Sequence, residues 1–194
     1  MARLDYTGPE APAGEEGEIV ERIRARRGGM LRPLDRMLLH SPPLADGWND
    51  LLGAVRTSTT LSGDVRELAI LRVAALNDAR YEWDAHEPIG RRCGLTDEHL
   101  AVMRDERGPE DLAPRLAAAL AYTDAMTTDV RVPEEVFAAL REHFDDRQVV
   151  ELTVTVSTYN LVSRFLVALE VGEESPDTTP GSETTTTDND EEAA

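Results

Sequence analysis

Residues 66–86 constrain the fold of this chain more than any other segment. After Glu67, residues 68–76 form a run of leucine, alanine, isoleucine and valine that only Arg72 interrupts, which is long enough for a helix and too apolar to face water on any side. A short polar break at Asn77-Asp78 follows, and a second, more polar helix begins near residue 79. Two helices separated by so short a break predict a helical hairpin whose first helix is buried.

The remainder of the chain predicts an all-α fold of about six to eight helices. Aromatic residues make up only 5% of the chain, a composition that favours packed helices over a β-sandwich. The β-branched run at 149–156 resembles a strand, but its unbroken length favours a buried helix. The main helices are expected over residues 16–27, 44–57, 64–76, 79–93, 111–127, 133–143 and 146–171, with shorter helical segments at 33–40 and after a Thr96 cap.

Local signals predict where several of these helices begin and end. Gly94 is expected just past the helix at 79–93, because glycine adopts the left-handed conformation without steric cost. Asp145 and Gln148 match a capping box that opens the last helix. These capping residues lie at the ends of the segments whose apolar residues recur with helical spacing, so the two kinds of signal predict the same helix ends.

Composition divides the chain into three parts. Residues 1–15 are rich in proline, glycine and glutamate and are expected to be disordered. Residues 16–172 are expected to form one helical domain. Residues 173–194 contain no large apolar side chain, so no burial offsets the entropy of ordering them. They are predicted to be an acidic, disordered tail.

The balance of charge limits the partners of the protein. The chain carries 38 acidic residues against 20 basic ones, a formal net charge of -18, and such a surface repels the phosphates of nucleic acids. All 20 basic residues are arginine. High acidity without lysine predicts adaptation to a salty cytoplasm, where salt screens the repulsion between carboxylates. The alternative is an ordinary acidic protein with a charged tail.

The halophilic interpretation predicts that the free energy of unfolding rises between low and high KCl. Screening weakens the mutual repulsion of the acidic side chains, which otherwise loosens the compact state. Denaturant unfolding curves recorded at a low and a high KCl concentration measure the effect. Equal stability at both concentrations would contradict this interpretation.

The cysteine content and the apolar segments indicate a soluble, cytoplasmic protein. The only cysteine, Cys93, excludes a disulfide framework and a CxxC redox motif. It is expected to be a small buried residue rather than a reactive thiol, because a helix C-terminus disfavours a thiolate. The N-terminus lacks the apolar region of a signal peptide, and no stretch reaches the ~18 apolar residues that a membrane helix needs.

Three ionisable side chains on the predicted hairpin are candidates for chemistry. Glu82 and His86 are four residues apart and share one face of a helix. A carboxylate beside an imidazole orients the ring and raises its pKa, which makes it a proton carrier near neutral pH. Glu67, on the preceding helix, completes a relay if the two helices pack together. The structural alternatives are a solvated Glu82–His86 pair and a Glu67 that caps its own helix.

Arginine side chains are the candidate ligands for an anionic substrate. Arg164 lies in the most apolar helix, where a buried guanidinium needs a carboxylate from the protein or from a ligand. Arg72, within the apolar run, and Tyr81, beside Glu82, complete the predicted substrate-binding set. No metal site is predicted, because the four histidines are far apart and no HxxxH or HExxH pattern occurs.

Three segments, RELAILRV at 66–73, YEWDAHEP at 81–88 and GLTDE at 94–98, closely resemble the carboxymuconolactone decarboxylase family. Its superfamily includes the alkylhydroperoxidase D-like (AhpD-like) proteins. Residues 151–165 resemble the closing helix of the family, and the resemblance covers approximately residues 33–171. It implies an all-helical AhpD-like fold and a homo-oligomer, a trimer or a hexamer, with sites near the subunit interfaces.

The resemblance also assigns the candidate residues. In the peroxidase branch of the family, a Glu precedes a CxxC pair, and a His follows the second cysteine by four residues. Glu67 and His86 match that Glu and that His, whereas Ala79 and Glu82 stand at the two cysteine positions. Without a dithiol, no thiol attacks a peroxide and no second thiol resolves the product. The Tyr-Glu-Trp-x-x-His form at 81–86 instead resembles the decarboxylase-like branch.

The decarboxylase resemblance implies a carboxy-lyase that acts on a small cyclic carboxylic acid by acid/base chemistry and needs no cofactor. His86 would exchange a proton with the substrate ring, Glu82 would set the tautomer of His86, and Glu67 would shuttle the proton. An arginine would hold the carboxylate. The alternatives are a thiol-dependent peroxidase, which the missing CxxC disfavours, and a non-catalytic helical oligomer.

Overall fold

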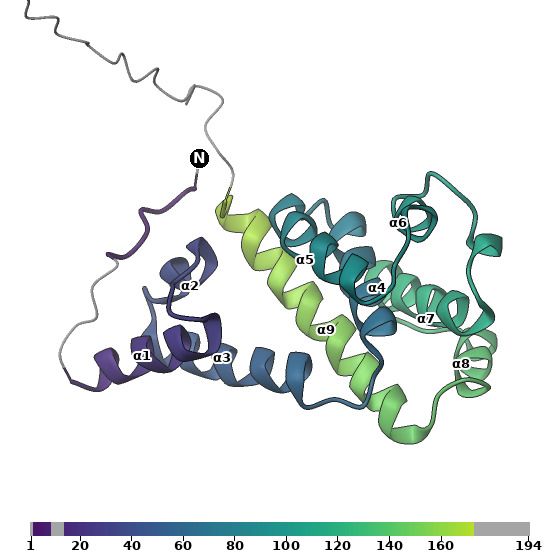
Figure 1. Ribbon diagram of the computed structural model, residues 1–194, viewed down its shortest axis with the longest axis horizontal. Helices are drawn as coiled ribbons and strands as arrows, with labels where there is room; N and C mark the ends of the chain where they lie inside the picture. Colours follow the sequence, from purple (N-terminus) through teal and green to yellow (C-terminus); the bar gives the residue numbers. More distant parts are fainter. Residues whose placement is uncertain (1, 9–13, 173–194) are drawn as a thin grey trace, which may run out of the picture.

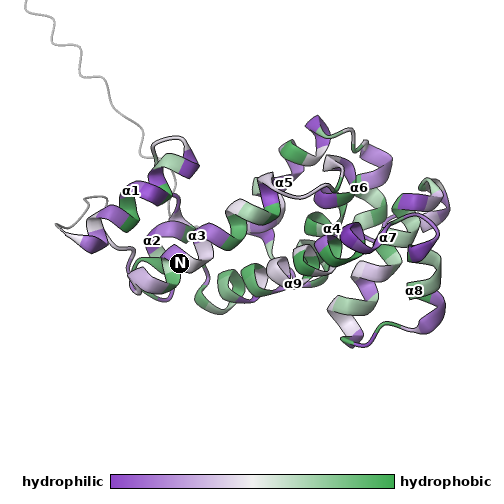
Figure 2. Ribbon diagram, turned by 90° about the horizontal axis from the view of Figure 1, so that it is seen from below, coloured by the Kyte–Doolittle hydropathy of each residue, from purple (hydrophilic) through white to green (hydrophobic). Residues whose placement is uncertain are grey.

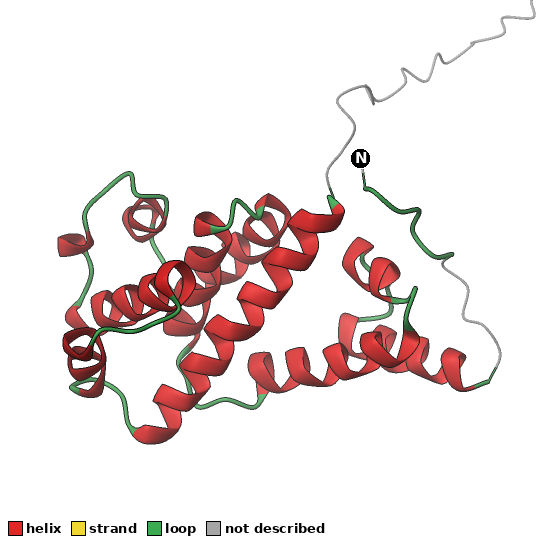
Figure 3. Ribbon diagram, turned by 180° about the vertical axis from the view of Figure 1, so that it is seen from behind, coloured by secondary structure: helices red, strands yellow, loops and turns green. Residues whose placement is uncertain are grey.

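The computed structural model describes residues 2–8 and 14–172, and this part of the chain is helical with no strand (Figures 1 and 3). The all-α prediction is confirmed, and each helix overlaps a predicted range. The α-helices are α1 (Glu15–Arg27), α2 (Pro33–Leu38), α3 (Pro42–Thr57), α4 (Gly63–Leu76), α5 (Arg80–Arg92), α6 (Asp97–Met103), α7 (Pro114–Asp124), α8 (Glu134–Arg141) and α9 (Asp146–Leu169).

The helices α4 and α9 form the centre of the fold. Every side chain from Glu67 to Ala74 is buried, as expected of a helix that is apolar on all sides. The longer α9 buries one side against α4, where Leu152, Val156 and Tyr159 are inaccessible to solvent. Figure 2 shows the apolar residues concentrated on these two helices. The remaining helices pack around them, with α5 and α7 against α4.

The helices α4 and α5 form the predicted hairpin. Asp78 adopts a left-handed backbone conformation (φ 51°) just past α4. The N–H groups of Asp78 and Ala79 donate to the carbonyls of Ala75 and Ala74, which satisfies the last carbonyls of the helix. Gly90 lets α5 approach α4 closely, because a Cβ at this position would lie 3.0 Å from leucine methyl groups. The sequence of the break therefore sets the turn that brings the two candidate helices together.

The predicted capping signals are confirmed, and the one large difference in helix bounds has a local cause. Thr96 caps α6 by accepting from the N–H of His99, and Asp145 and Gln148 form the capping box of α9. The helix expected over 111–127 instead begins at Pro114. It ends in a π-helical turn, η2 (Ala125–Asp129), and a 3-10 turn, η1 (Pro109–Asp111), precedes it. Proline favours the first helical position because it has no N–H to leave unsatisfied there.

The N-terminal segment lies against the end of α9, within the stretch for which disorder was predicted. The backbone N–H of Arg3 donates to the carbonyl of Leu169 (3.0 Å), and the Arg3 guanidinium pairs with Glu170 (2.9 Å). Residues 2–8 therefore make specific contacts. Residues 1, 9–13 and 173–194, which include the predicted acidic tail, lie outside the described residues.

The helix α9 is long and apolar enough, by length and composition alone, to cross a membrane. The expectation that no segment reaches this length is therefore wrong. Half of its most apolar stretch is buried inside the fold, as in the core helix of a globular domain. On the buried side, the Asn77 amide of α4 donates to Asn160 (3.1 Å) and to Ser163 (2.8 Å). These bonds attach α9 to the end of α4.

The first three helices pack on one another and lie beside α9, on the side away from α7 and α8 (Figure 1). The connection of α3 to α4 carries the chain from this group into the central core. The arrangement places three arginines opposite α5: one at the end of α1, one before α2 and one near the end of α3. The candidate site lies between these two parts of the fold.

Candidate active site

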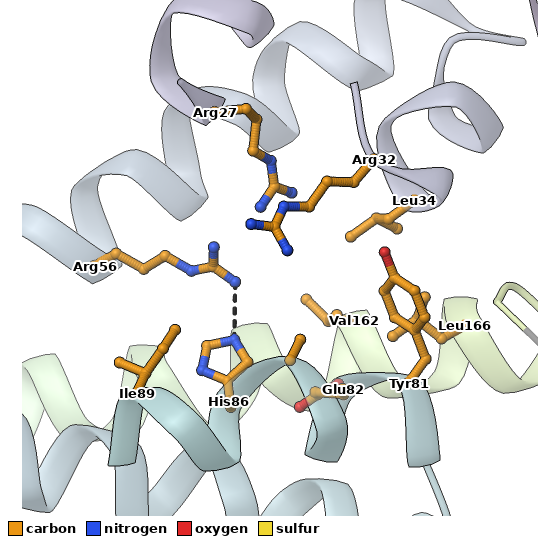
Figure 4. A pocket seen from close by; sticks show the side chains of 11 residues that line it. Arg27, Arg32, Leu34, Arg56, Tyr81, Glu82, His86, Ile89, Val162 and Leu166 are labelled. Atoms are coloured by element: carbon orange, nitrogen blue, oxygen red, sulfur yellow. Dashed lines mark hydrogen bonds between the residues drawn. The ribbon is translucent and has the colours of Figure 1, made fainter. Parts of the chain in front are cut away.

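A cavity of about 80 Å³ lies where α5 and α9 face the N-terminal helices (Figure 4). Its polar lining comprises three arginines from the N-terminal helices together with Tyr81, Glu82 and His86 of α5. Its apolar lining includes Ile89 of α5 and Val162 of α9. A cavity in which charged and polar side chains converge beside an apolar wall is a candidate small-molecule site.

Glu67 and His86 form a buried pair across the α4–α5 hairpin. The Nδ1 atom of His86 lies 2.7 Å from the Oε2 atom of Glu67, and both side chains are about 97% inaccessible. A carboxylate only accepts hydrogen bonds, so Nδ1 carries the proton and Nε2 holds the lone pair. The second oxygen of Glu67 accepts from Arg66 (3.2 Å). Glu67 therefore sets the tautomer of His86, which corrects the assignment of that role to Glu82.

Arg56 and Tyr159 occupy the other side of the His86 ring. The Nη2 atom of Arg56 donates to Nε2 of His86 (3.0 Å), and its Nε atom donates to the Tyr159 hydroxyl (2.8 Å). That hydroxyl also lies 3.3 Å from Nε2, and the two rings meet edge to face. Burial raises the pKa of Tyr159 to about 12, so the phenol stays neutral and protonated. Both nitrogens of His86 are thus engaged by protein groups.

The pKa of His86 lies below its usual value, contrary to the expected rise. Burial penalises the charged imidazolium, and the positive charge of Arg56 adds to this penalty. The hydrogen bond to Glu67 acts in the opposite direction but does not outweigh the burial. His86 is therefore neutral near pH 7, with one nitrogen donating and the other accepting.

Glu82 is the one described side chain whose carboxylate oxygens are both buried without a hydrogen-bond partner. Its side chain is almost inaccessible, and it lines the cavity one helical turn before His86. Burial raises the pKa of this carboxyl well above its usual value, and the nearby Arg56 offsets the rise only in part. A buried, unpaired carboxyl group is costly to a fold, which marks it as a functional candidate.

The N-terminal helices give the cavity a positive wall. Figure 4 shows Arg27, Arg32 and Arg56 pointing from these helices toward His86. Arg27 pairs with Asp35 (2.9 Å), whereas no carboxylate of the described residues lies within salt-bridge distance of Arg32 or Arg56. Two guanidinium groups without a carboxylate partner, in a chain of net charge -18, indicate a site for an anion.

The structure brings some of the predicted site residues together and leaves others outside. Glu67, Glu82, His86 and Tyr81 lie at the cavity or directly beneath it. Arg72 and Arg164 do not. Arg72 is buried among α6 and α7 and Arg164 is exposed, donating to the carbonyl of Asn160 one turn earlier. The arginines that do reach the cavity, Arg27, Arg32 and Arg56, were missed by sequence reasoning, as was Tyr159.

Arg72 has a structural role that predicts a loss of stability on substitution. Its guanidinium donates to Asp124 (2.6 Å), to the carbonyl of Met103 (2.8 Å) and to Asp105 (2.8 Å). The carboxylates that remain after Arg72→Met are partly or largely exposed, so we expect a loss of about 1–3 kcal/mol rather than the larger cost of a fully buried pair. Urea unfolding measures this. Loss of anion binding in a folded Arg72→Met protein would contradict the structural role.

The positions of the potential metal ligands and of Cys93 bear on metal and thiol chemistry. No group of three or more His, Cys, Asp or Glu side chains within the described ranges is arranged to hold a metal ion. Cys93 lies at the C-terminal end of α5 against Gly63 and does not line the cavity.

The carboxymuconolactone decarboxylase family matches residues 42–125, which span α3 to the end of α7 and include the three residues of the hairpin. Among curated proteins, the uncharacterized protein YdfG of Bacillus subtilis (strain 168) is 26% identical over 113 residues, which cover 57% of this chain and 77% of YdfG. The family match therefore covers Arg56 and the α4–α5 hairpin, whereas Arg27, Arg32 and Tyr159 lie outside it.

Solved structures share the fold. A protein of unknown function from Agrobacterium tumefaciens, ATU0492, for which the antioxidant defence protein AhpD is the suggested assignment, is 26% identical (TM-score 0.63; 68% of this chain, 90% of that one). A peroxidase-related protein from Ralstonia eutropha JMP134 with an AhpD core is 22% identical (TM-score 0.73; 88% and 90%). The debrominase Bmp8 bound to 2,3,4-tribromopyrrole is 14% identical (TM-score 0.69; 88% and 94%). The family match over residues 42–125 and this AhpD-like fold support the assignment of the chain to the carboxymuconolactone decarboxylase family.

Proposed function

We propose that this protein is an enzyme that carries out cofactor-independent acid/base chemistry on a small cyclic carboxylic acid, by decarboxylation or a related proton transfer. One observation carries the proposal. The cavity places guanidinium groups without carboxylate partners opposite a buried carboxyl and a neutral imidazole. The arginines suit a carboxylate, the apolar walls suit a ring, and the Glu82–His86 pair suits proton exchange.

Decarboxylation of such an acid requires few functional groups from the protein. When the bond between the ring and its carboxylate breaks, carbon dioxide leaves and the electron pair stays on the ring carbon. A carbonyl conjugated with that carbon accepts the charge, so the step as written needs no cofactor. A proton then bonds to the ring carbon, and solvent returns a proton to the protein. The protein must hold the acid, exclude water from the ring and supply that proton at the right place.

The two alternatives have less support. Thiol-dependent peroxidase activity needs a cysteine in the cavity, and Cys93 lies outside it. A non-catalytic oligomer is favoured by a solvated Glu82–His86 pair with no adjacent cavity, whereas here both side chains are buried and line one. Assembly into a homo-oligomer and a cytoplasmic location both remain predictions. The debrominase Bmp8, bound to a small heterocycle, is consistent with a ring ligand in this fold.

Binding of 2-furoate tests the proposal without knowledge of the true substrate. This probe is a five-membered ring with one carboxylate, and furfuryl alcohol is its neutral analogue. We expect calorimetry to detect 2-furoate but not the alcohol, and Arg56→Gln to weaken binding about 10- to 100-fold, since a charged hydrogen bond is lost. Arg164→Gln, which removes a guanidinium outside the cavity, should leave the affinity unchanged.

Turnover is then measured with carboxymuconolactone and related unsaturated ring acids. The release of carbon dioxide is the quantity measured. Release that depends on the protein, and that Arg56→Gln lowers while Cys93→Ala does not, supports the proposal. Peroxide-dependent thiol oxidation that Cys93→Ala abolishes would contradict it. Failure of 2-furoate and of these ring acids to bind would also contradict it.

A further inference from the structure

The hydrogen bonds around His86 leave this residue without a free nitrogen for a substrate. Its Nδ1 proton is directed at Glu67 (2.7 Å), and its Nε2 lone pair accepts from Arg56 (3.0 Å) with the Tyr159 hydroxyl at 3.3 Å. Proton transfer between two heavy atoms needs them within hydrogen-bond reach of each other. For His86 to reach a ligand, a charged donor and a phenol would first have to leave Nε2.

One edge of the Arg56 guanidinium is hydrogen-bonded to the protein, and its other edge is available to a ligand. Nε and Nη2 lie on one edge of the planar guanidinium and donate to Tyr159 and His86. Nη1 makes no hydrogen bond with the described residues. A carboxylate binds a guanidinium through two parallel N–H groups, and the edge formed by Nη1 and Nη2 offers such a pair. A ligand can therefore bind Arg56 without breaking its bond to His86.

Glu82 presents the opposite situation. Both of its oxygens lack a partner, its side chain lines the cavity, and it comes from the same helix as His86, one turn earlier. The positive charge of Arg56 acts on it. It is the one acidic group that lines the cavity, and the described residues leave its hydrogen-bonding capacity unused.

From this geometry we infer a division of labour within the proposed function: Glu82 exchanges the proton with the ligand, and His86 is a positioning residue. Glu67 holds His86, His86 and Tyr159 hold one edge of Arg56, and the other edge of Arg56 holds the carboxylate of the ligand. This reverses the roles that the sequence motif indicates for Glu82 and His86.

The step balances with Glu82 as the acid. The ring–carboxylate bond breaks, carbon dioxide leaves, and its electron pair remains on the ring carbon. The O–H bond of Glu82 then breaks and its proton bonds to that carbon, leaving Glu82 as a carboxylate. The positive charge of Arg56 stabilises this carboxylate until water supplies a proton after the product leaves. No oxidant or reductant takes part.

The inference rests on the proposed function, but it can be tested in the ligand-free protein. The test is nuclear magnetic resonance of labelled side chains. With glutamate carboxyl carbons and histidine nitrogens labelled, the Glu82 and His86 signals are assigned by their loss in Glu82→Gln and His86→Gln. We expect Glu82 to keep its proton to a higher pH than exposed glutamates do, and His86 to show one protonated and one accepting nitrogen.

Adding 2-furoate separates the two assignments. We expect it to move the Glu82 signal and to leave the hydrogen-bonded state of Nε2 of His86 unchanged. A Glu82 that ionises with exposed glutamates, or a Nε2 signal that shows the loss of Arg56 when 2-furoate binds, would overturn the inference while leaving the anion site intact. If 2-furoate fails to bind although the ligand-free signals are as expected, the proposed function fails instead.

Discussion

Glu82→Gln is expected to lower the turnover number for a ring-acid substrate by about 100- to 10,000-fold, the usual contribution of a positioned acid or base. Glutamine has nearly the same shape and fits the same place, but its amide has no acidic proton to deliver. The arginines that hold the carboxylate are untouched, so the Michaelis constant and the affinity for 2-furoate should change little. Steady-state kinetics of the two proteins, alongside calorimetry with 2-furoate, measure both effects.

His86→Gln provides the matched comparison. Its loss releases one edge of Arg56, so we expect weaker 2-furoate binding and a higher Michaelis constant, with a smaller effect on the turnover number than Glu82→Gln. If His86 were the proton donor, this pattern would be inverted. An equal loss of turnover in both variants, with unchanged affinity in both, would contradict the separate roles.

The stability of the protein should depend on pH through Glu82. The pKa of Glu82 is raised in the folded state above its usual value of 4.5, so between these two pKa values the folded protein binds more protons than the unfolded chain. Relative to Glu82→Gln, the wild-type protein is then most stable below about pH 4.5. Its free energy of unfolding, relative to that of Glu82→Gln, falls by ~1.4 kcal/mol for each pH unit above that value. The fall stops once Glu82 ionises in the folded state as well.

Urea unfolding of both proteins at a series of pH values between about 5 and 8 measures this difference. The other titrating groups, His86 included, are common to both proteins, so their contributions largely cancel in the comparison. Parallel stability profiles for the two proteins would show that Glu82 ionises as easily in the folded state as in the unfolded chain. That result would remove the basis for the role of Glu82 as the proton donor.

The hairpin could be predicted from the sequence because its determinants are local. Apolar periodicity, the Asn77-Asp78 break and the caps each act within a few residues, and they place Glu67 and His86 on facing helices. The roles of those residues could not be predicted in the same way. The i,i+4 spacing of Glu82 and His86 says that they share a face, but not which carboxylate the ring turns toward. The ring turns toward Glu67 of the neighbouring helix.

The arginines that line the cavity could not be predicted from local sequence patterns. Arg72 and Arg164 were favoured because apolar neighbours indicate burial, yet Arg164 falls on the solvent side of its helix. Arg56 stands in the last turn of an amphipathic helix, where a basic residue usually complements the helix dipole. Its contacts lie 30 residues away at His86 and 103 residues away at Tyr159. Only the packing of the N-terminal helices against the core reveals them.

A crystal structure of the protein with 2-furoate would show directly which side chain meets the ring. We expect the carboxylate against the free edge of Arg56 and the ring within contact distance of Glu82, with His86 still bonded to Glu67 and Arg56. A complex in which Arg56 has left His86, with Nε2 of His86 facing the ring, would contradict it, as would 2-furoate bound outside this cavity.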